Sequence, residues 1–332
     1  MMISSVVIVE QMLVICLLIL IGAFLYKKKL LTDEGTRQIS TLIVQITNPA
    51  IMLSTAIEEE EIIPPAEIGR AFALAVAAYA LSALAGFLIS LLLRSDAGDR
   101  IAIVMMTMYA NVGFIGIPLA LATLGTRSMV YVTINNLVYS LLFYTTGIPL
   151  IRRSAMIRNG TWERKKTDGS GRSLGGWRDA LKSLMHIGTI AAILSVFIYL
   201  FHPEVPSLIA DPLLYAGRCT TFLSMLVLGV SVAGSPVRKW LTDKKIWVFV
   251  LLRGIVTPVA VSLMLSPFIH DDLLTDVVLL LVAVPSGSLP MIVSREQGLD
   301  DQIFARGIIL STLFSPVTIP VAAALAHFLM RL

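Results

Sequence analysis

Long apolar runs constrain this chain more than any other feature. Each run is roughly twenty residues long, enough for a helix to cross the hydrocarbon layer of a bilayer. Apolar residues make up 56% of the 332 residues and charged residues 14%, with a mean hydropathy of +0.84. This composition excludes an ordinary soluble domain and predicts an all-α integral membrane protein. The predicted spans, about ten in number, are approximately 6–26, 39–57, 71–93, 101–123, 128–150, 183–201, 213–233, 246–269, 277–294 and 303–330.

Lysine and arginine are distributed unevenly between the connections that join these spans. Connections after odd-numbered spans are basic, whereas those after even-numbered spans have almost no lysine or arginine, the exceptions being Arg70 and Arg127. By the positive-inside rule the basic connections are cytoplasmic, so we expect a multi-pass protein of the inner (plasma) membrane with both termini outside the cytoplasm. The formal net charge of +4 is then an insertion signal, and no nucleic-acid partner is expected.

A long polar segment divides the chain nearly in half. Residues 152–182 are rich in Gly, Ser and Arg and predict a cytoplasmic basic linker between two five-helix repeats, 1–151 and 183–332. An odd number of spans in each half forces the halves to insert in opposite senses, which predicts an inverted repeat. Transporters with inverted repeats bind their substrate at discontinuous helices in matching positions of the two halves.

Helix breakers occupy matching positions in the fourth and ninth spans. The fourth contains YANVGFIGIPLA (109–120) and the ninth contains VPSGSLP (284–290). Because proline removes a backbone donor and the starts of half-helices carry partial positive charge, we predict two crossed broken helices that form an anion site. The alternative is that these residues merely kink membrane helices. The site residues assigned here are Asn111, Gly113, Pro118, Pro285, Ser286, Gly287, Ser288 and Pro290.

Other polar residues lie within the second and fifth spans. Asn48 precedes a proline in the second span, where it either lines the substrate site or marks a packing kink. Asn135, Asn136 and Tyr139 in the fifth span either face the same cavity or hold helices together through hydrogen bonds. We include all four among the candidate substrate-binding residues.

Two arginines and two hydroxyl residues are weaker candidates. Arg218 and Arg253 lie one or two turns inside their spans, so they either extend to the interface or act as a counter-charge for the substrate. Ser311 and Thr312 lie in the last span. The broken spans carry no Asp or Glu between 100 and 127 or between 276 and 295, so we expect no direct proton exchange at the crossing.

Three motifs resemble the auxin efflux carrier family: NVGFIGIPLALATLG, VPSGSLPMIVSREQG and, in the last span, STLFSPVTIPVA. The resemblance implies a bundle of ten helices in two inverted repeats, similar to the bile acid/sodium symporters, with the fourth and ninth helices crossed. Asn111 and Pro118 match the crossover residues of the first half, and Pro285 and Pro290 those of the second. Ser286 stands where plant members more often have a larger amide, which argues against auxin itself as the substrate.

The resemblance implies a secondary transporter rather than an enzyme. Its expected activity is export of small organic anions, auxin-like or malate/malonate-like carboxylates, by an elevator mechanism driven by the membrane potential. A sodium-coupled symporter of the bile-acid type and a membrane sensor with a transporter fold remain the alternatives. We expect no cofactor, with a sodium ion left open because oxygen ligands suit this cation. The expected partners are the organic anion, membrane lipids and a second copy of the chain in a homodimer.

Overall fold

The described part of the chain is helical. The computed structural model describes residues 5–58, 64–158, 187–234, 236, 240–269, 271–287, 289–291 and 302–331. Six helical stretches of 25 to 28 residues are long and apolar enough to cross a membrane: Asp33–Glu58, Pro65–Leu92, Ser128–Ser154, Ser207–Ala233, Lys244–Phe268 and Ile303–Met330. Shorter apolar helices cover Leu13–Lys27, Val112–Leu124 and Ile187–Phe201. The prediction of an all-α membrane protein is therefore confirmed, while the number of ten spans stays a prediction.

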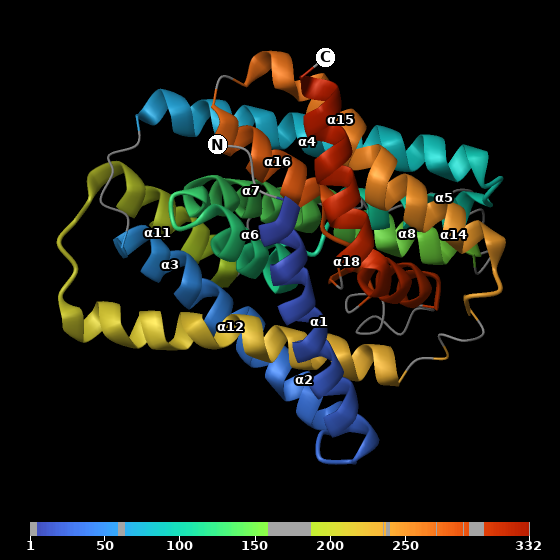
Figure 1. Cartoon of the computed structure of the whole chain (residues 1–332), viewed down its shortest axis with the longest axis horizontal. Helices are drawn as coiled ribbons and strands as arrows, with labels where there is room; N and C mark the ends of the chain where they lie inside the picture. The colour runs from blue at the N-terminus through green and yellow to red at the C-terminus, as the bar shows by residue number, and fades with distance from the viewer. Residues whose placement is uncertain are drawn as a thin grey trace, which may run out of the picture.

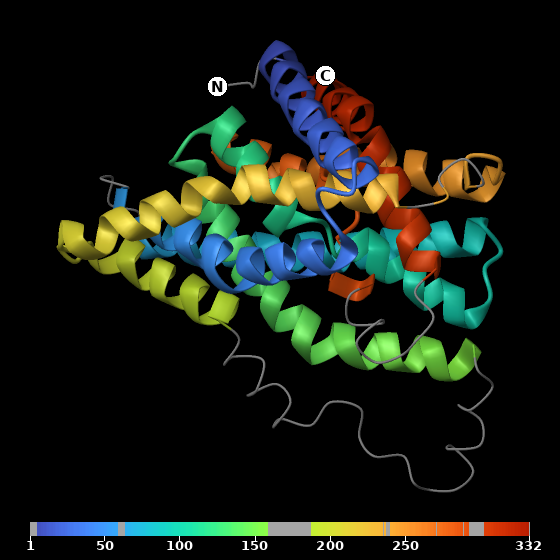
Figure 2. The same cartoon turned by 90° about the horizontal axis from the view of Figure 1, so that it is seen from below.

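One group of helices comes from the beginnings of the two halves of the chain (Figures 1 and 2). It contains α1 (Ser5–Lys27), α2 (Asp33–Leu42), α3 (Asn48–Glu58), α11 (Ile187–Phe201) and α12 (Ser207–Ala233). Helix α12 packs against both α1 and α3, and α11 packs against α3. Helices α1 and α12 touch through backbone: a Cβ atom on Gly229 would lie 2.1 Å from the Ile19 carbonyl oxygen. Glycine permits this close approach, which is how membrane helices gain packing energy.

A second group contains the remaining long helices. Its members are α4 (Pro65–Leu92), α5 (Ala97–Met108), α8 (Ile148–Arg158), α14 (Lys244–Leu251), α15 (Thr257–Leu265), α16 (Asp272–Ala283) and α18 (Gln302–Met330). Helix α5 packs between α4 and α8, and α15 contacts both α16 and α18. Helices α6 (Ile117–Leu124) and α7 (Ser128–Leu142) are counted with this second group, and α7 contacts α3 and α11 of the first group as well as α4 and α16. Helix α8 includes the first seven residues of the predicted linker, and residues 159–186 lie outside the described part.

Within the described part of the chain, four helical segments contain a π-turn, and each π-turn ends two residues before a proline. The pairs are η1 (Ile43–Thr47) with Pro49, η2 (Val112–Gly116) with Pro118, η3 (Phe143–Gly147) with Pro149, and η4 (Leu252–Val256) with Pro258. A proline lacks an N–H and its ring clashes with the carbonyl of residue i−4. One extra residue in the preceding turn moves this carbonyl aside, so that the helix continues past the proline.

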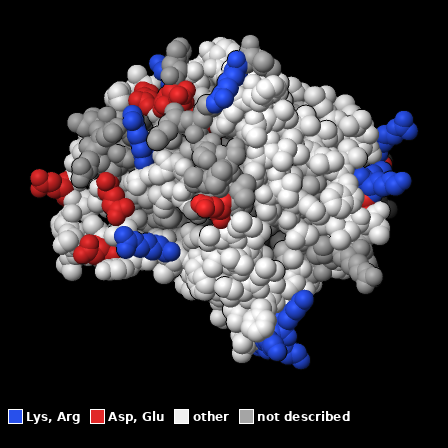
Figure 3. Space-filling view, viewed as in Figure 1, with Lys and Arg blue, Asp and Glu red and all other residues white. Residues whose placement is uncertain are grey.

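Apolar side chains dominate the surface of the bundle. Leu17 and Leu20 of α1, Leu88 of α4 and Phe222 of α12 are exposed along with many other large apolar residues. In Figure 3 a broad area to the right of the centre is white, and blue side chains lie around it at the top, at the right-hand edge and at the lower tip. Apolar surface of this extent indicates contact with lipid.

Candidate functional site

The two predicted broken spans are interrupted where the breakers lie, and their interruptions meet. Helix α5 ends at Met108 and α16 ends at Ala283, and the residues that follow form an isolated antiparallel bridge between Ala110 and Ser286. The Asn111 N–H donates to the Pro285 carbonyl at 2.7 Å, and the Gly287 N–H donates to the Tyr109 carbonyl at 2.8 Å. Backbone groups that the interruptions release thus pair with each other.

Local sequence explains why the chain unwinds at these points. Pro285 disfavours helical dihedrals in the preceding residue, and Val284 is indeed extended, with φ −59° and ψ 147°. Asn111 is the N-cap of the helix that restarts at Val112, and its Oδ1 accepts the Phe114 N–H at 3.3 Å. A Cβ atom on Gly287 would lie 3.0 Å from each of two carbonyl oxygens across the bridge, which favours glycine there.

A cavity of about 80 Å³ lies beside this crossing. It has room for roughly five water molecules or for a ligand of a few heavy atoms. Its walls come from both groups of helices and from the crossing itself. The lining residues are Val44, Asn48, Met52, Ala110, Asn111, Val112, Gly113, Phe114, Asn136, Tyr139, Ser140, Gly188, Gly287 and Leu289.

Two asparagines at this cavity have amide atoms without a partner. Asn111 is 3% exposed, and its buried Nδ2 has no hydrogen-bond partner among the described residues; the same holds for Asn48 Oδ1. Asn48 packs on the crossing, since a Cβ atom on Gly113 would lie 2.8 Å from Asn48 Nδ2. Unsatisfied buried polar groups are costly, so a ligand or water is expected to complete them. The Asn111 donor beside the positive start of the helix at Val112 suits an anion.

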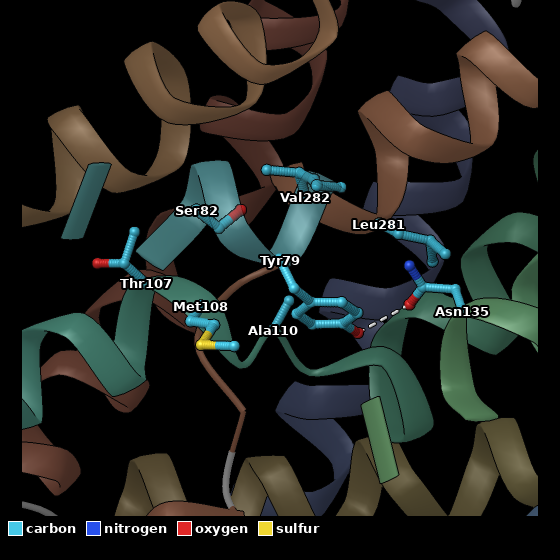
Figure 4. A pocket seen from close by; sticks show the side chains of 9 residues that line it. Tyr79, Ser82, Thr107, Met108, Ala110, Asn135, Leu281 and Val282 are labelled. Atoms are coloured by element: carbon cyan, nitrogen blue, oxygen red, sulfur yellow. Dashed lines mark hydrogen bonds between the residues drawn. The ribbon is translucent and has the colours of Figure 1, made fainter. Parts of the chain in front are cut away.

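The fifth span contributes to the cavity with one face only. Asn136 and Tyr139 line it, and Asn136 Nδ2 donates weakly to the Met52 sulfur at 3.4 Å. Asn135 instead accepts the Tyr79 hydroxyl at 2.9 Å and lines a smaller cavity of about 10 Å³ (Figure 4). The two adjacent asparagines therefore serve different cavities.

The remaining predicted site residues shape the crossing without lining the larger cavity. Pro118 lies in the first turn of α6, and Pro285 and Pro290 border the interruption of the ninth span. Ser286 is buried within the bridge, where its N–H donates to Ser311 Oγ at 3.2 Å and its own hydroxyl has no partner among the described residues. Ser288 lies outside the described residues.

Some lining residues were not predicted from the sequence. Met52 lies one turn after Asn48, and Ser140 lies one turn after Asn136. Residues at i and i+4 share a helix face, so this spacing is a signal that would have found both. Gly188, in the first turn of α11, carries no comparable signal.

Arg253 does not extend to the membrane interface, so that interpretation is wrong for this residue. Its side chain is only 1% exposed because η4 is packed among α4, α16 and α18. The guanidinium donates through Nη1 to the Val282 carbonyl at 2.9 Å and through Nε to the Met106 carbonyl at 3.4 Å. Arg218 on α12 is exposed, as expected for a side chain that extends outward.

A helical membrane bundle with interrupted helices beside a polar cavity is typical of membrane transporters. The family described as "Membrane transport protein" matches residues 7–173 and 177–323. The chain belongs to this family, the auxin efflux carrier family that the motifs predicted. An uncharacterized transporter of Methanocaldococcus jannaschii is 24% identical over 321 residues, covering 93% of this chain and 96% of that protein. Family and relative both indicate a transporter rather than an enzyme.

Proposed function

We propose that the protein is a secondary transporter that exports small carboxylates across the inner membrane, with both termini outside the cytoplasm. The observation that carries this proposal is the unpartnered Asn111 amide, which lies in a cavity at the positive start of a helix. An amide donor and a helix start bind a carboxylate without a buried lysine or arginine in the cavity wall. The cavity volume of about 80 Å³ favours a substrate of few heavy atoms.

The transport movement we propose is an elevator-type displacement of one helix group against the other. In this scheme the first group of helices is the scaffold: α1, α2, α3, α11 and α12. Both groups are built from ten spans arranged as two inverted repeats. The cavity supports the scheme because Asn48 and Gly188 come from the scaffold, whereas Asn111, Asn136 and Gly287 come from the other group. A relative movement of the two groups would therefore open this cavity.

A cross-link between the groups tests the movement. The side-chain ends of Asn136 and Met52 contact each other across the two groups, so a reducible bifunctional thiol reagent that joins Asn136→Cys to Met52→Cys should stop flux until it is reduced. The matched control pair, Tyr79→Cys with Asn135→Cys, also joins residues whose side-chain ends touch but lies within one group, and it should respond less to the same reagent. Both pairs are made in a background without the native cysteines. Unchanged flux through the cross-linked Asn136–Met52 pair would contradict the elevator movement.

The membrane potential alone is sufficient to drive export of an anion. A charge gains ~2.3 kcal/mol per 100 mV, and ~1.4 kcal/mol corresponds to a tenfold concentration ratio. A negative-inside potential of ~100 mV therefore sustains roughly a fortyfold outward gradient of a monoanion. This mechanism needs no coupling ion.

Flux in proteoliposomes tests the proposed activity. Purified protein is reconstituted with radiolabelled malate, malonate or indole-3-acetate, with and without a potassium diffusion potential and with and without sodium. Sodium-independent flux that follows the potential is the expected result. Flux that requires sodium would support the symporter of the bile-acid type instead, and no flux of any acid would refute transport and favour a sensor.

A further inference from the structure

Arg253 is a fully buried cation without an acidic partner. It forms no ion pair with any carboxylate of the described residues, although the surrounding helices exclude it from water. A buried charge is unfavourable unless other groups compensate it, and an ionisable residue inside a membrane bundle points to a functional role. Two backbone carbonyls compensate part of this charge, through Nη1 and Nε, while Nη2 is buried without a partner among the described residues.

These carbonyls are the ends of both interrupted helices. Met106 lies in the last turn of α5 and Val282 in the last turn of α16, and the Arg253 guanidinium donates a hydrogen bond to the carbonyl of each. The last carbonyls of a helix have no intrahelical partner, and each helix end carries roughly half a negative charge. Two ends sum to about one negative charge, which a single arginine neutralises.

A cation-coupled carrier uses such carbonyl ends differently. In these carriers the C-terminal ends of half-helices coordinate the coupling sodium ion. Here the smaller cavity between the same ends, lined by Tyr79, Ser82, Thr107 and Val282 among others, has about 10 Å³ (Figure 4). That volume is about the size of one water molecule. Arg253 is not among the residues that line this cavity; its guanidinium instead donates to the Met106 and Val282 carbonyls, which are the helix-end groups that a cation would otherwise use.

We propose that Arg253 is a tethered cation that neutralises the carbonyl ends of both interrupted helices and thereby makes anion transport independent of sodium. The inference deepens the proposed function, and the part of the inference that concerns transport rests on that proposed function. With the negative helix ends neutralised, the positive helix start at Val112 dominates the field at the larger cavity. Arg253 is thus a positioning residue, which acts on the substrate through the helix ends.

Thermal unfolding of the purified full-length protein tests the cation without any substrate. Arg253→Ala leaves a space of guanidinium shape, so millimolar guanidinium should raise its lowered Tm. The matched control is Arg218→Ala, which removes an exposed arginine from another membrane helix and should not respond. An equal response of the two variants, or none in Arg253→Ala, would overturn the tethered-cation role.

Flux measurements test the consequence for coupling, and they use variants that keep the size of the side chain. Malonate is the probe, with sodium or choline as the bulk cation. Wild type and Arg253→Lys should give flux that is independent of sodium, because both retain the charge. Arg253→Gln should bind malonate more weakly: one charge acting over ~10 Å at an effective dielectric constant of ~20 gives roughly tenfold for each negative charge of the ligand, and so roughly a hundredfold or more for the malonate dianion. Sodium should restore part of this loss.

Three outcomes distinguish the inference from the proposed function. Sodium-dependent flux in wild type, or wild-type flux in Arg253→Gln, would overturn the inference. An equal loss of malonate binding in Arg253→Lys and Arg253→Gln would also overturn the inference, because the positive charge would then not account for the binding. If wild type moves none of the acids tested, the proposed function fails, while the guanidinium response still decides whether Arg253 is a tethered cation.

Discussion

Replacement of Asn111 by aspartate separates the two roles that the structure gives this side chain. Asn111 Oδ1 caps a helix by accepting the Phe114 N–H, while Nδ2 is buried without a partner among the described residues. Aspartate keeps the capping oxygen but replaces the amide donor with a second, negatively charged oxygen. We expect Asn111→Asp to keep the helix cap, to be less stable because its carboxylate is buried, and to lose anion binding.

The two effects act on different properties. Asn and Asp are equivalent as N-caps, but position 111 is only 3% exposed, so an ionised carboxylate there should also lower the free energy of unfolding by several kcal/mol. A substrate carboxylate at hydrogen-bond range would instead meet a like charge ~4 Å away, a repulsion of ~4 kcal/mol at an effective dielectric constant of 20. With ~1.4 kcal/mol for each factor of ten, binding should weaken roughly a thousandfold.

The assay compares thermal unfolding, malonate binding and malonate flux on the same preparations. Asn111→Ser keeps a capping oxygen without adding charge, and loss of one hydrogen bond to a charged group should weaken binding by roughly tenfold to a hundredfold. Asn135→Ser is the matched control, because Asn135 lines the smaller cavity and bonds to Tyr79. Near-normal malonate binding and flux in Asn111→Asp would refute the assignment of Asn111 as the anion donor.

Two further substitutions test the packing of the bundle. Gly229→Leu should prevent α1 from docking on α12, because its Cβ would lie 2.1 Å from the Ile19 carbonyl oxygen. Little monodisperse protein is expected in size-exclusion chromatography, while Gly69→Ala, with open space around its Cβ, should behave as wild type or slightly better. His327→Ala should lower Tm, since it removes the 2.7 Å partner of the buried Asp276 carboxylate and leaves a cost of about 1–3 kcal/mol. Here His327→Gln should recover part of the loss, and equal Tm values for the two variants would contradict this reasoning.

The sequence was sufficient to locate the interruptions, because their causes are local. Proline and glycine act through backbone sterics within one or two residues, so the unwinding around Asn111 and Pro285 follows from the residues themselves. The contact between these two segments could also be predicted, because the helix breakers lie in the corresponding span of each half of the chain. Composition was less informative about the linker: Arg152 to Arg158 continue α8, because arginine, alanine and methionine are good helix formers.

The rotation of each helix about its own axis could not be predicted from the sequence. Adjacent residues differ by ~100° in direction, and both Asn135 and Asn136 are polar, so no local pattern indicates which faces the crossing. The burial of Arg253 depends on packing by α4, α16 and α18, and its hydrogen bonds depend on two carbonyls that become available only where α5 and α16 end. Such features arise from tertiary packing, and a single sequence contains no short-range signal for them.

The four π-turns connect the proline pattern with the site. Each π-turn lies next to a side chain at the crossing or contains one. Asn48, which packs on Gly113, follows η1 directly, and η2 restarts the helix after Asn111. In η3 the Thr146 hydroxyl bonds to the Tyr109 hydroxyl at 3.2 Å, and η4 contains Arg253. A π-turn rotates the following helix relative to a regular one, so a proline two residues later fixes which side chains face inward. The prolines of these helices therefore contribute to the site by setting helix rotation, although none of them lines the larger cavity.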